Sequence, residues 1–307
     1  MIDIVVPFYN DSDNIWRDIM LDYMAEENSV DRQVVGEERY RNWECFKYWF
    51  RCVEKNCPWV NKVFLIVASE TQIPEWLDIN SSKLKVVYHR DYIPNELLPT
   101  FNTMTIEIFV SRIKELSENY IYCNDDYFFL NPTKSTMFFV DDYPVHRDNA
   151  DKLVKFDEGY LKGSDGTFYQ MLNNGIDLQL EIAGDKAKWY ALDHLPVAHK
   201  KSFEKEIIDK YYDRFINANL QSRFRYKDNF SNHVFVCLYK DLKPYYKFNG
   251  YNSYYLTVRD DTNFEDHANC TMICFNDTEQ LTDFENAKRK MIDFFEKRFP
   301  EKSSFEK

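Results

Sequence analysis

Short apolar runs separated by longer stretches of mixed polarity mark the first 130 residues. Three of these runs, residues 2–8, 63–68 and 84–88, have the length and apolar character of strands buried in a sheet. A fourth run, residues 120–130, is apolar and aromatic except for Asn124, Asp125 and Asp126. We read it as one more buried strand, with the polar triplet at its carboxyl end.

Amphipathic stretches connect these runs and predict helices. One helical pattern opens at Trp16, a long one covers residues 37–56, and a third covers residues 103–116. The resulting order is strand, helix, strand, strand, helix, strand, which indicates an α/β domain with a largely parallel sheet. Because the carboxyl ends of parallel strands meet at one edge, residues 10–13, 89–91 and 124–126 are expected to line one crevice.

The pattern weakens in the second half of the chain. Residues 138–192 predict an irregular region with some helix near 167–172, and helices follow at 202–220, with Ser202 as the cap, and at 279–299. No repeat or flexible linker divides the chain. We therefore expect one domain with an α/β portion (1–137), a variable region (138–192) and a helical portion (193–307).

Composition and charge exclude several classes of function. The 307 residues carry a net charge of −12, which disfavours nucleic acids and polybasic adhesion to anionic lipid. Only 7 glycines are present, and neither the dinucleotide fingerprint nor the P-loop motif occurs. The 7 cysteines form no C-x-x-C pair, which favours reduced thiols and the cytoplasm. No apolar run approaches the roughly 20 residues of a membrane span.

Adjacent carboxylates at the end of a buried strand are costly unless something compensates them. A divalent cation such as Mg²⁺ or Mn²⁺, bridging Asp125 and Asp126 to a phosphorylated ligand, would do so. A turn or helix cap is the alternative, and it is the commoner use of an Asp pair taken alone. Asp3 has two similar interpretations, as a cap for a neighbouring backbone group or as a ligand contact. His267, Cys270 and Cys274 suggest zinc, against the alternative of buried thiols.

Polar blocks at the ends of these elements resemble the Stealth family of sugar-1-phosphate transferases. The blocks, in chain order, are D-I-V-V-P-F-Y-N-D-S-D-N-I-W (3–16), R-Y-R-N-W-E (39–44), R-C-V-E-K-N-C-P-W-V (51–60), Q-I-P-E-W-L (72–77), V-V-Y-H-R-D (86–91), L-P-T-F-N-T-M-T-I-E (98–107), I-Y-C-N-D-D-Y-F-F (121–129), D-H-L-P-V-A-H-K-K (193–201), R-F-R-Y-K-D (223–228), C-F-N-D (274–277) and F-P-E-K-S-S-F-E (299–306). The resemblance covers most of the chain outside residues 138–190. Pro7, Phe8 and Asp11 depart from the family pattern, and His199 lies further from His194 than in the lysosomal member of the family.

The resemblance implies a Rossmann-like sheet, similar to that of nucleotide-sugar transferases, and a specific chemistry. A sugar-1-phosphate, expected to be an N-acetylhexosamine-1-phosphate, passes from a UDP-sugar to a sugar hydroxyl of a surface or capsular polysaccharide. UMP is then released, and the acceptor is expected on a lipid carrier at the inner membrane face, where the protein would associate peripherally without spanning the bilayer.

The same resemblance assigns roles to individual residues. His194 is the expected general base, Arg225 neutralises phosphate charge, and Asp126 takes part in catalysis. Asp125, Asp126 and Asp277 are the expected ligands of Mg²⁺ or Mn²⁺. The expected substrate-binding residues are Asp3, Asn10, Asp13, Arg41, His89, Asn102, His199, Lys200 and Arg223.

Two other functions fit parts of the sequence. A metal-dependent glycosyltransferase would also use acidic residues at a strand end, but it would release UDP and does not need the blocks at 193–201 and 223–228. A carbohydrate-binding module would account for the 17% aromatic residues, but not for separate polar blocks at element ends.

Overall fold

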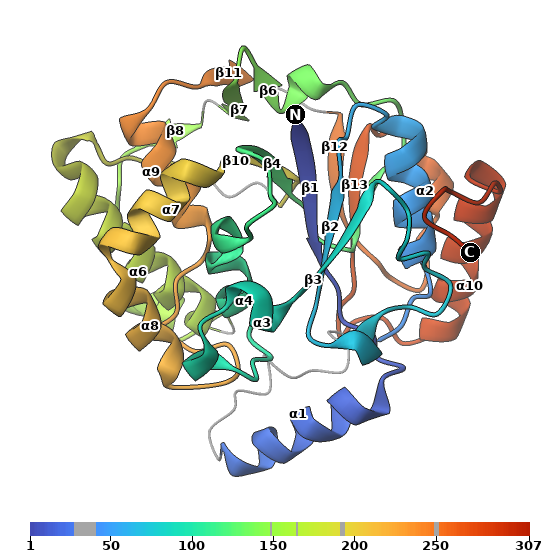
Figure 1. Cartoon of the computed structure of the whole chain (residues 1–307), viewed down its shortest axis with the longest axis horizontal. Helices are drawn as coiled ribbons and strands as arrows, with labels where there is room; N and C mark the ends of the chain where they lie inside the picture. The colour runs from blue at the N-terminus through green and yellow to red at the C-terminus, as the bar shows by residue number, and fades with distance from the viewer. Residues whose placement is uncertain (28–40, 148, 164, 191–193, 249–251) are drawn as a thin grey trace.

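The central sheet has five strands in the order β10-β4-β1-β2-β3 (Figure 1). The computed structural model describes residues 1–27, 41–147, 149–163, 165–190, 194–248 and 252–307. Four strands run parallel, and β10 is antiparallel to β4 at one edge. Their bounds are β1 (Ile2–Pro7), β2 (Val63–Val67), β3 (Leu84–Tyr88), β4 (Asn119–Tyr122) and β10 (Val197–Lys200). The predicted α/β class with a mostly parallel sheet is confirmed.

Alternate residues of the strands enter two hydrophobic cores, one on each face of the sheet. Ile4 and Val6 of β1 belong to one core, and Val5 belongs to the other. Burial on both faces explains why the strands read as continuous apolar runs. The first core includes residues of α2 (Phe46–Asn56) and α10 (Phe284–Arg298). The second includes residues of α4 (Thr103–Ile108), α7 (Lys201–Lys210), α8 (Tyr212–Leu220) and α9 (His233–Leu242). Figure 1 shows the two helical layers on either side of the strands.

The strand order reverses between β1 and β4. From β1 the chain adds β2 and β3 on one side, and it then crosses back to place β4 on the other side of β1. Open α/β sheets bind ligands at such a switch point, beyond the carboxyl ends of the strands. The turn after β4 and the loop after β1, which leads into α1 (Asn14–Glu26), both lie there (Figure 1).

The prediction of one strand over residues 120–130 is wrong, because two strands of different sheets share this run. β4 ends at Tyr122, and β5 (Tyr127–Phe129) joins a second sheet in the order β12-β13-β5. Its other strands are β12 (Ser253–Thr257) and β13 (Met272–Asn276). The backbone N–H of Phe275 in β13 bonds the carbonyl of Asp126 at 3.0 Å. The acidic pair thus lies in the turn where the chain passes from one sheet to the other.

Four predicted helices differ in their bounds. The helix expected over 279–299 begins only at Phe284. The stretch 37–56 is helical only from Phe46; residues 41–45 are not helical, and 28–40 lie outside the described residues. The helix over 103–116 ends at Ile108, and a short 3-10 turn follows (Val110–Arg112). The stretch 202–220 divides into α7 and α8, and Lys200 rather than Ser202 is the residue at the N-cap of α7.

The region read as irregular contains a long helix. α6 (Gly166–Ala183) packs against α9, and a glycine at position 175 brings the backbone of α6 close to the side chain of Val234. Short elements complete the region, namely β6 (Phe139–Val140), β7 (Tyr143–Arg147), β8 (Ala150–Asp151), α5 (Glu158–Leu161) and β9 (Trp189–Tyr190), and later β11 (Tyr246–Phe248). Helices are more prominent in the second half, as expected.

Candidate active site

The turn after β4 holds two half-buried carboxylates with little compensation. Burial, reinforced by the neighbouring charge of Asp126, raises the pKa of Asp125 to about 7. Burial also raises the pKa of Asp126, although the charge of His194 and the thiol of Cys274 act in the opposite direction. Oδ1 of Asp126 is buried and has no hydrogen-bond partner among the described residues. A positive charge from a ligand or a cation would therefore be stabilised here.

One side of the turn is a row of side chains on the second sheet. Cys274 of β13 is in register with Tyr127 of β5 on one side and with Tyr255 of β12 on the other. Residues in register across neighbouring strands point to the same face. The imidazole of His194 contacts both tyrosines, with ring centroids 5.3 Å from Tyr127 and 5.1 Å from Tyr255. The sheet register thus places His194 over the row.

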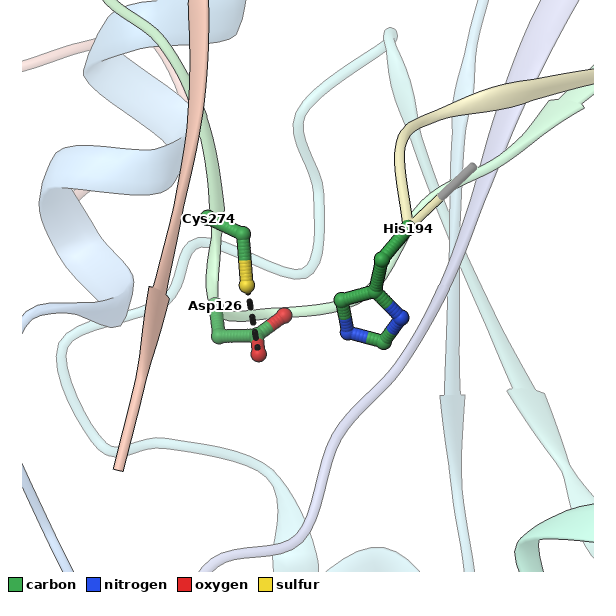
Figure 2. A group of neighbouring side chains, drawn as sticks. All are labelled: Asp126, His194 and Cys274. Carbon is green, nitrogen blue, oxygen red and sulfur yellow. Dashed lines mark hydrogen bonds between the residues drawn. The ribbon is translucent and has the colours of Figure 1, made fainter. Parts of the chain in front are cut away.

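Asp126, His194 and Cys274 converge from three parts of the chain. Each offers one ligand atom, and these atoms all lie within 4.8 Å of one another. Sγ of Cys274 donates to Oδ2 of Asp126 at 3.3 Å, and Figure 2 shows the carboxyl group between the thiol and the imidazole. His194 is exposed and lies just before β10. Because β10 is antiparallel to β4, the residues that precede β10 lie at the carboxyl end of β4, beside the acidic turn.

The opposite side of the turn carries Glu107, which the sequence reasoning did not single out. Burial raises the pKa of Glu107 to about 7, opposed by the hydroxyl of Tyr122 and by the charge of Arg225. Burial and the charge of Glu107 raise the pKa of Tyr122. The charge of Asp125 adds to this increase, so Tyr122 lies close to both carboxylates. The sequence does contain a feature that could have identified Glu107. It is a lone carboxylate among the buried apolar residues of α4, at the end of the block 98–107.

Arg225 lies in the segment 222–229, which is tied to the start of α4. Its Nη2 donates to Oγ1 of Thr103 at 2.7 Å. The buried amide of Asn102 donates to the carbonyl of Phe224 at 3.0 Å and to Oδ1 of Asn229 at 2.8 Å. Asn102, expected to bind substrate, is thus the residue that fixes the position of the Arg225 segment. Arg223 donates to the carbonyl of Glu96 at 3.1 Å, on the same side.

The loop after β1 is held by hydrogen bonds to the segment that follows β2 and by the cap of α1. Asp13 caps α1 by accepting from the N–H of Trp16 at 3.1 Å, and its other oxygen accepts from Thr71 at 2.5 Å and Gln72 at 2.8 Å. Burial would raise the pKa of Asp13, but these hydrogen bonds outweigh it and lower the pKa. The backbone of Asn10 exchanges hydrogen bonds with Gln72 at 2.7 and 3.2 Å. Both residues shape the loop at the switch point, and their contact with a nucleotide stays a prediction.

Asp277 does not join the carboxylates of the turn. Its oxygens contact Arg41 at 3.4 Å and the indole N–H of Trp43 at 3.2 Å. It is absent from the cluster around Asp126 that the described residues form. The expected use of Asp277 as a third metal ligand therefore has no geometric support, because Arg41 already balances its charge.

His89 is buried at the end of β3, in edge contact with Trp16 at 6.4 Å. Burial lowers its pKa to about 3, so the ring is neutral at physiological pH. Its Nδ1 is buried without a hydrogen-bond partner among the described residues, and direct contact with substrate stays a prediction.

Three predicted binding residues lie away from the switch point, toward the amino ends of the strands. The buried Asp3 accepts from Asn61 at 2.7 Å, from the N–H of Lys62 at 3.2 Å and from the N–H of Ser117 at 2.8 Å. Lys200 donates to Asn119 at 2.6 Å. His199 is buried, bonded to Glu204 at 2.6 Å and stacked on Tyr120. For Asp3 the capping interpretation is the correct one. The ring of His199 also lies edge-on to Tyr122, the last residue of β4, with centroids 6.4 Å apart.

The zinc grouping of His267, Cys270 and Cys274 does not form. His267 stacks on Tyr254 with centroids 4.5 Å apart, whereas Cys274 faces Asp126. All 7 cysteines are described and free, as the sequence predicted.

Comparison with known proteins identifies the family. The models of Stealth conserved regions 2 and 4 match residues 39–146 and 265–307. The capsular polysaccharide phosphotransferase WcwK of Streptococcus pneumoniae is 32% identical over 332 aligned positions, covering 100% of this chain and 98% of the relative. The chain belongs to the Stealth family. The resemblance seen in the sequence is confirmed, and so is the expectation of an enzyme of the phosphotransferase class.

Other relatives of this Stealth protein carry related names. An exopolysaccharide phosphotransferase of Lactiplantibacillus plantarum is 30% identical over 100% of this chain and 96% of its own length. The receptor polysaccharide phosphotransferase WefC of Streptococcus gordonii is 42% identical over 46% of this chain and 42% of its own length. Within the described ranges, no helix of the Stealth protein combines the length and apolar character that crossing a bilayer requires.

Proposed function

We propose that this Stealth protein transfers a sugar-1-phosphate, of the N-acetylhexosamine type, from a UDP-sugar to a hydroxyl group of a growing polysaccharide. The products are a phosphodiester and UMP. The observation that carries the proposal is the placement of an exposed histidine beside an uncompensated acidic pair at the switch point of the sheet. The relatives named as polysaccharide phosphotransferases support the acceptor class. The lipid-linked form of the acceptor and the cytoplasmic location stay predictions.

His194 is the group that accepts the proton of the attacking hydroxyl. A histidine suits this role because it can take up a proton near neutral pH. The exposed ring is reachable by an acceptor sugar, and the carboxyl group of Asp126 lies beside it. Tyr127 and Tyr255 hold the ring from two sides.

The donor diphosphate needs positive charge, and two sources fit the structure. Arg225 is held near Glu107 and Thr103, on the side of the turn opposite His194. Asp125 and Asp126 fit Mg²⁺ or Mn²⁺, because their carboxylates are adjacent, their pKa values are raised and one buried oxygen lacks a partner among the described residues. Such an ion, when bound, supplies charge that stabilises the transferring phosphoryl group.

The nucleotide product tests this proposal. The protein is incubated with UDP-N-acetylglucosamine and a panel of oligosaccharide acceptors, with and without Mg²⁺, and UMP is separated from UDP by chromatography. Formation of UMP that depends on both acceptor and metal is expected, and other UDP-sugars are then compared as donors. Formation of UDP would instead identify a glycosyltransferase and would overturn the proposal.

A further inference from the structure

We infer that Asp126, His194 and Cys274 form a binding site for Zn²⁺, and that occupation of this site by zinc inhibits the enzyme. The three side chains offer oxygen, nitrogen and sulfur. Zn²⁺ accepts this mixture, whereas Mg²⁺ prefers oxygen ligands alone. The site therefore differs in chemistry from the magnesium site proposed for the two carboxylates, although both include Asp126.

The distances fit a tetrahedral ion. Bond lengths of about 2.3 Å to sulfur and 2.0 Å to oxygen place the two ligand atoms about 3.5 Å apart at the tetrahedral angle. Sγ of Cys274 lies 3.3 Å from Oδ2 of Asp126, and one ligand atom from each of the three side chains lies within 4.8 Å of the other two. Only the imidazole has to approach, and its side chain is exposed to solvent apart from its contacts with Tyr127 and Tyr255.

The sheet holds Cys274 in a position that suits a metal ligand. Cys274 is fully buried in the middle strand of the second sheet, between Tyr127 and Tyr255. Although Cys274 belongs to the first hydrophobic core, its thiol donates to Oδ2 of Asp126 (Figure 2). Three protein ligands leave a fourth position for water or a substrate oxygen, as in open zinc sites. Binding releases the thiol proton to solvent, and no electron transfer is involved.

Inhibition follows from which residues are shared, and this part of the inference depends on the proposed function. A zinc ion bound to the nitrogen of His194 blocks the lone pair that has to accept the proton of the acceptor hydroxyl. The same ion removes Asp126 from the magnesium site. Zinc-loaded enzyme is therefore inactive, and removal of zinc by a chelator restores activity.

Cobalt binding tests the site without any use of activity. The full-length, metal-free protein is titrated with Co²⁺, which reports thiolate coordination as a ligand-to-metal charge-transfer band in the near ultraviolet. We expect the band in the wild-type protein and in Cys270→Ser, a matched control at a half-buried thiol outside the cluster. It should be lost in Cys274→Ser, whose fold is checked by thermal unfolding.

A second variant covers the case in which Cys274→Ser fails to fold. His194→Ala changes an exposed side chain, so the fold should be retained. We expect it to keep the charge-transfer band while binding Co²⁺ at least about 10–100-fold more weakly. Absence of the band in the wild-type protein, its persistence in Cys274→Ser, or unchanged affinity in His194→Ala would each overturn the site.

The activity arm separates this inference from the proposed function. Zn²⁺ should inhibit UMP formation by the wild-type protein and by Cys270→Ser. At the same zinc concentrations, Cys274→Ser should keep a rate close to the one that it shows without zinc. Equal inhibition of the Cys274→Ser variant would contradict the inhibitory role. If no UMP forms with any UDP-sugar, the proposed function fails, and the cobalt spectra still decide the metal site.

Discussion

The parallel strands of the central sheet have polar groups at both of their ends, which we call the amino edge and the carboxyl edge. Buried or half-buried polar groups occur at both, but their hydrogen bonding differs. At the amino edge, Asp3 accepts three hydrogen bonds and Lys200 donates to Asn119. At the carboxyl edge, Asp125 and Glu107 have pKa values raised to about 7, and one oxygen of Asp126 has no partner among the described residues. Charges satisfied within the protein stabilise the fold, whereas charges left uncompensated in a crevice mark the place for a ligand.

The largest expected effect is that of Asp126→Asn. We expect activity to fall by about 10³-fold or more, because the variant removes charge that the reaction needs. Stability should be unchanged or higher, since one of two adjacent buried charges is gone. Initial rates of UMP formation and thermal unfolding measure the two effects. Retention of more than about a tenth of the activity would remove Asp126 from the proposed chemistry.

His194→Ala should lower the rate by about 10²- to 10⁴-fold without loss of fold, as expected for removal of a general base. The matched control is His267→Ala, which removes a histidine that likewise contacts a tyrosine ring but lies outside the Asp126 cluster. Its rate should equal that of the wild-type protein. Equal losses in the two variants would show that His194 acts only through packing.

Asp3→Asn tests the opposite edge. The amide group would present a donor where the carboxylate now accepts N–H groups, so we expect a loss of about 1–3 kcal/mol in the free energy of unfolding. Activity per folded molecule should remain within about twofold, because Asp3 lies at the far end of β1 from the crevice. Chemical denaturation and active-site-normalised rates measure this. A large loss of activity in fully folded protein would contradict the division between the two edges.

The smallest expected effect concerns pH. The pKa of Glu107 rises from 4.5 to about 7 on folding, so between these values the folded protein holds more protons than the unfolded chain. The stability contributed by protonated Glu107 is complete below pH 4.5 and is lost as the pH rises through 7. Glu107→Gln should remove this dependence. The full change in pKa corresponds to about 3 kcal/mol, and solvent screening of the half-buried carboxyl group reduces it to the order of 1–2 kcal/mol. Denaturation midpoints across that pH range measure it, and identical pH profiles for the two proteins would contradict the raised pKa.

The sequence predicted the fold better than the positions of individual side chains. Burial on both faces made the strands of the central sheet readable, and the loops after β1 and β4 were expected at the correct edge. Asp125, Asp126 and His194 were named from their blocks, and the structure brings Asp126 and His194 together. Neither the strand pattern nor the naming of these three residues needs knowledge of long-range pairing, whereas their approach in space depends on the pairing of β10 with β4.

The errors arose where long-range pairing decides the outcome. Residues 120–130 divide into two strands because β13, about 145 residues later in the chain, pairs with β5 and places it in a second sheet. The same pairing brings Cys274 to Asp126, which no local pattern shows. The antiparallel direction of β10 sends His199 and Lys200 toward the amino edge while leaving His194 at the carboxyl edge. Local polarity alone could not separate these residues.

The central claim is that the carboxyl edge transfers a sugar together with its phosphate. The most direct test uses a UDP-sugar labelled at the β-phosphorus, with an oligosaccharide acceptor and the wild-type, Asp126→Asn and Asp3→Asn proteins. The account predicts that label enters the glycan with the wild-type and Asp3→Asn proteins, and that transfer is abolished in Asp126→Asn. Label remaining in released UDP, or equal transfer by Asp126→Asn and the wild-type protein, would contradict it.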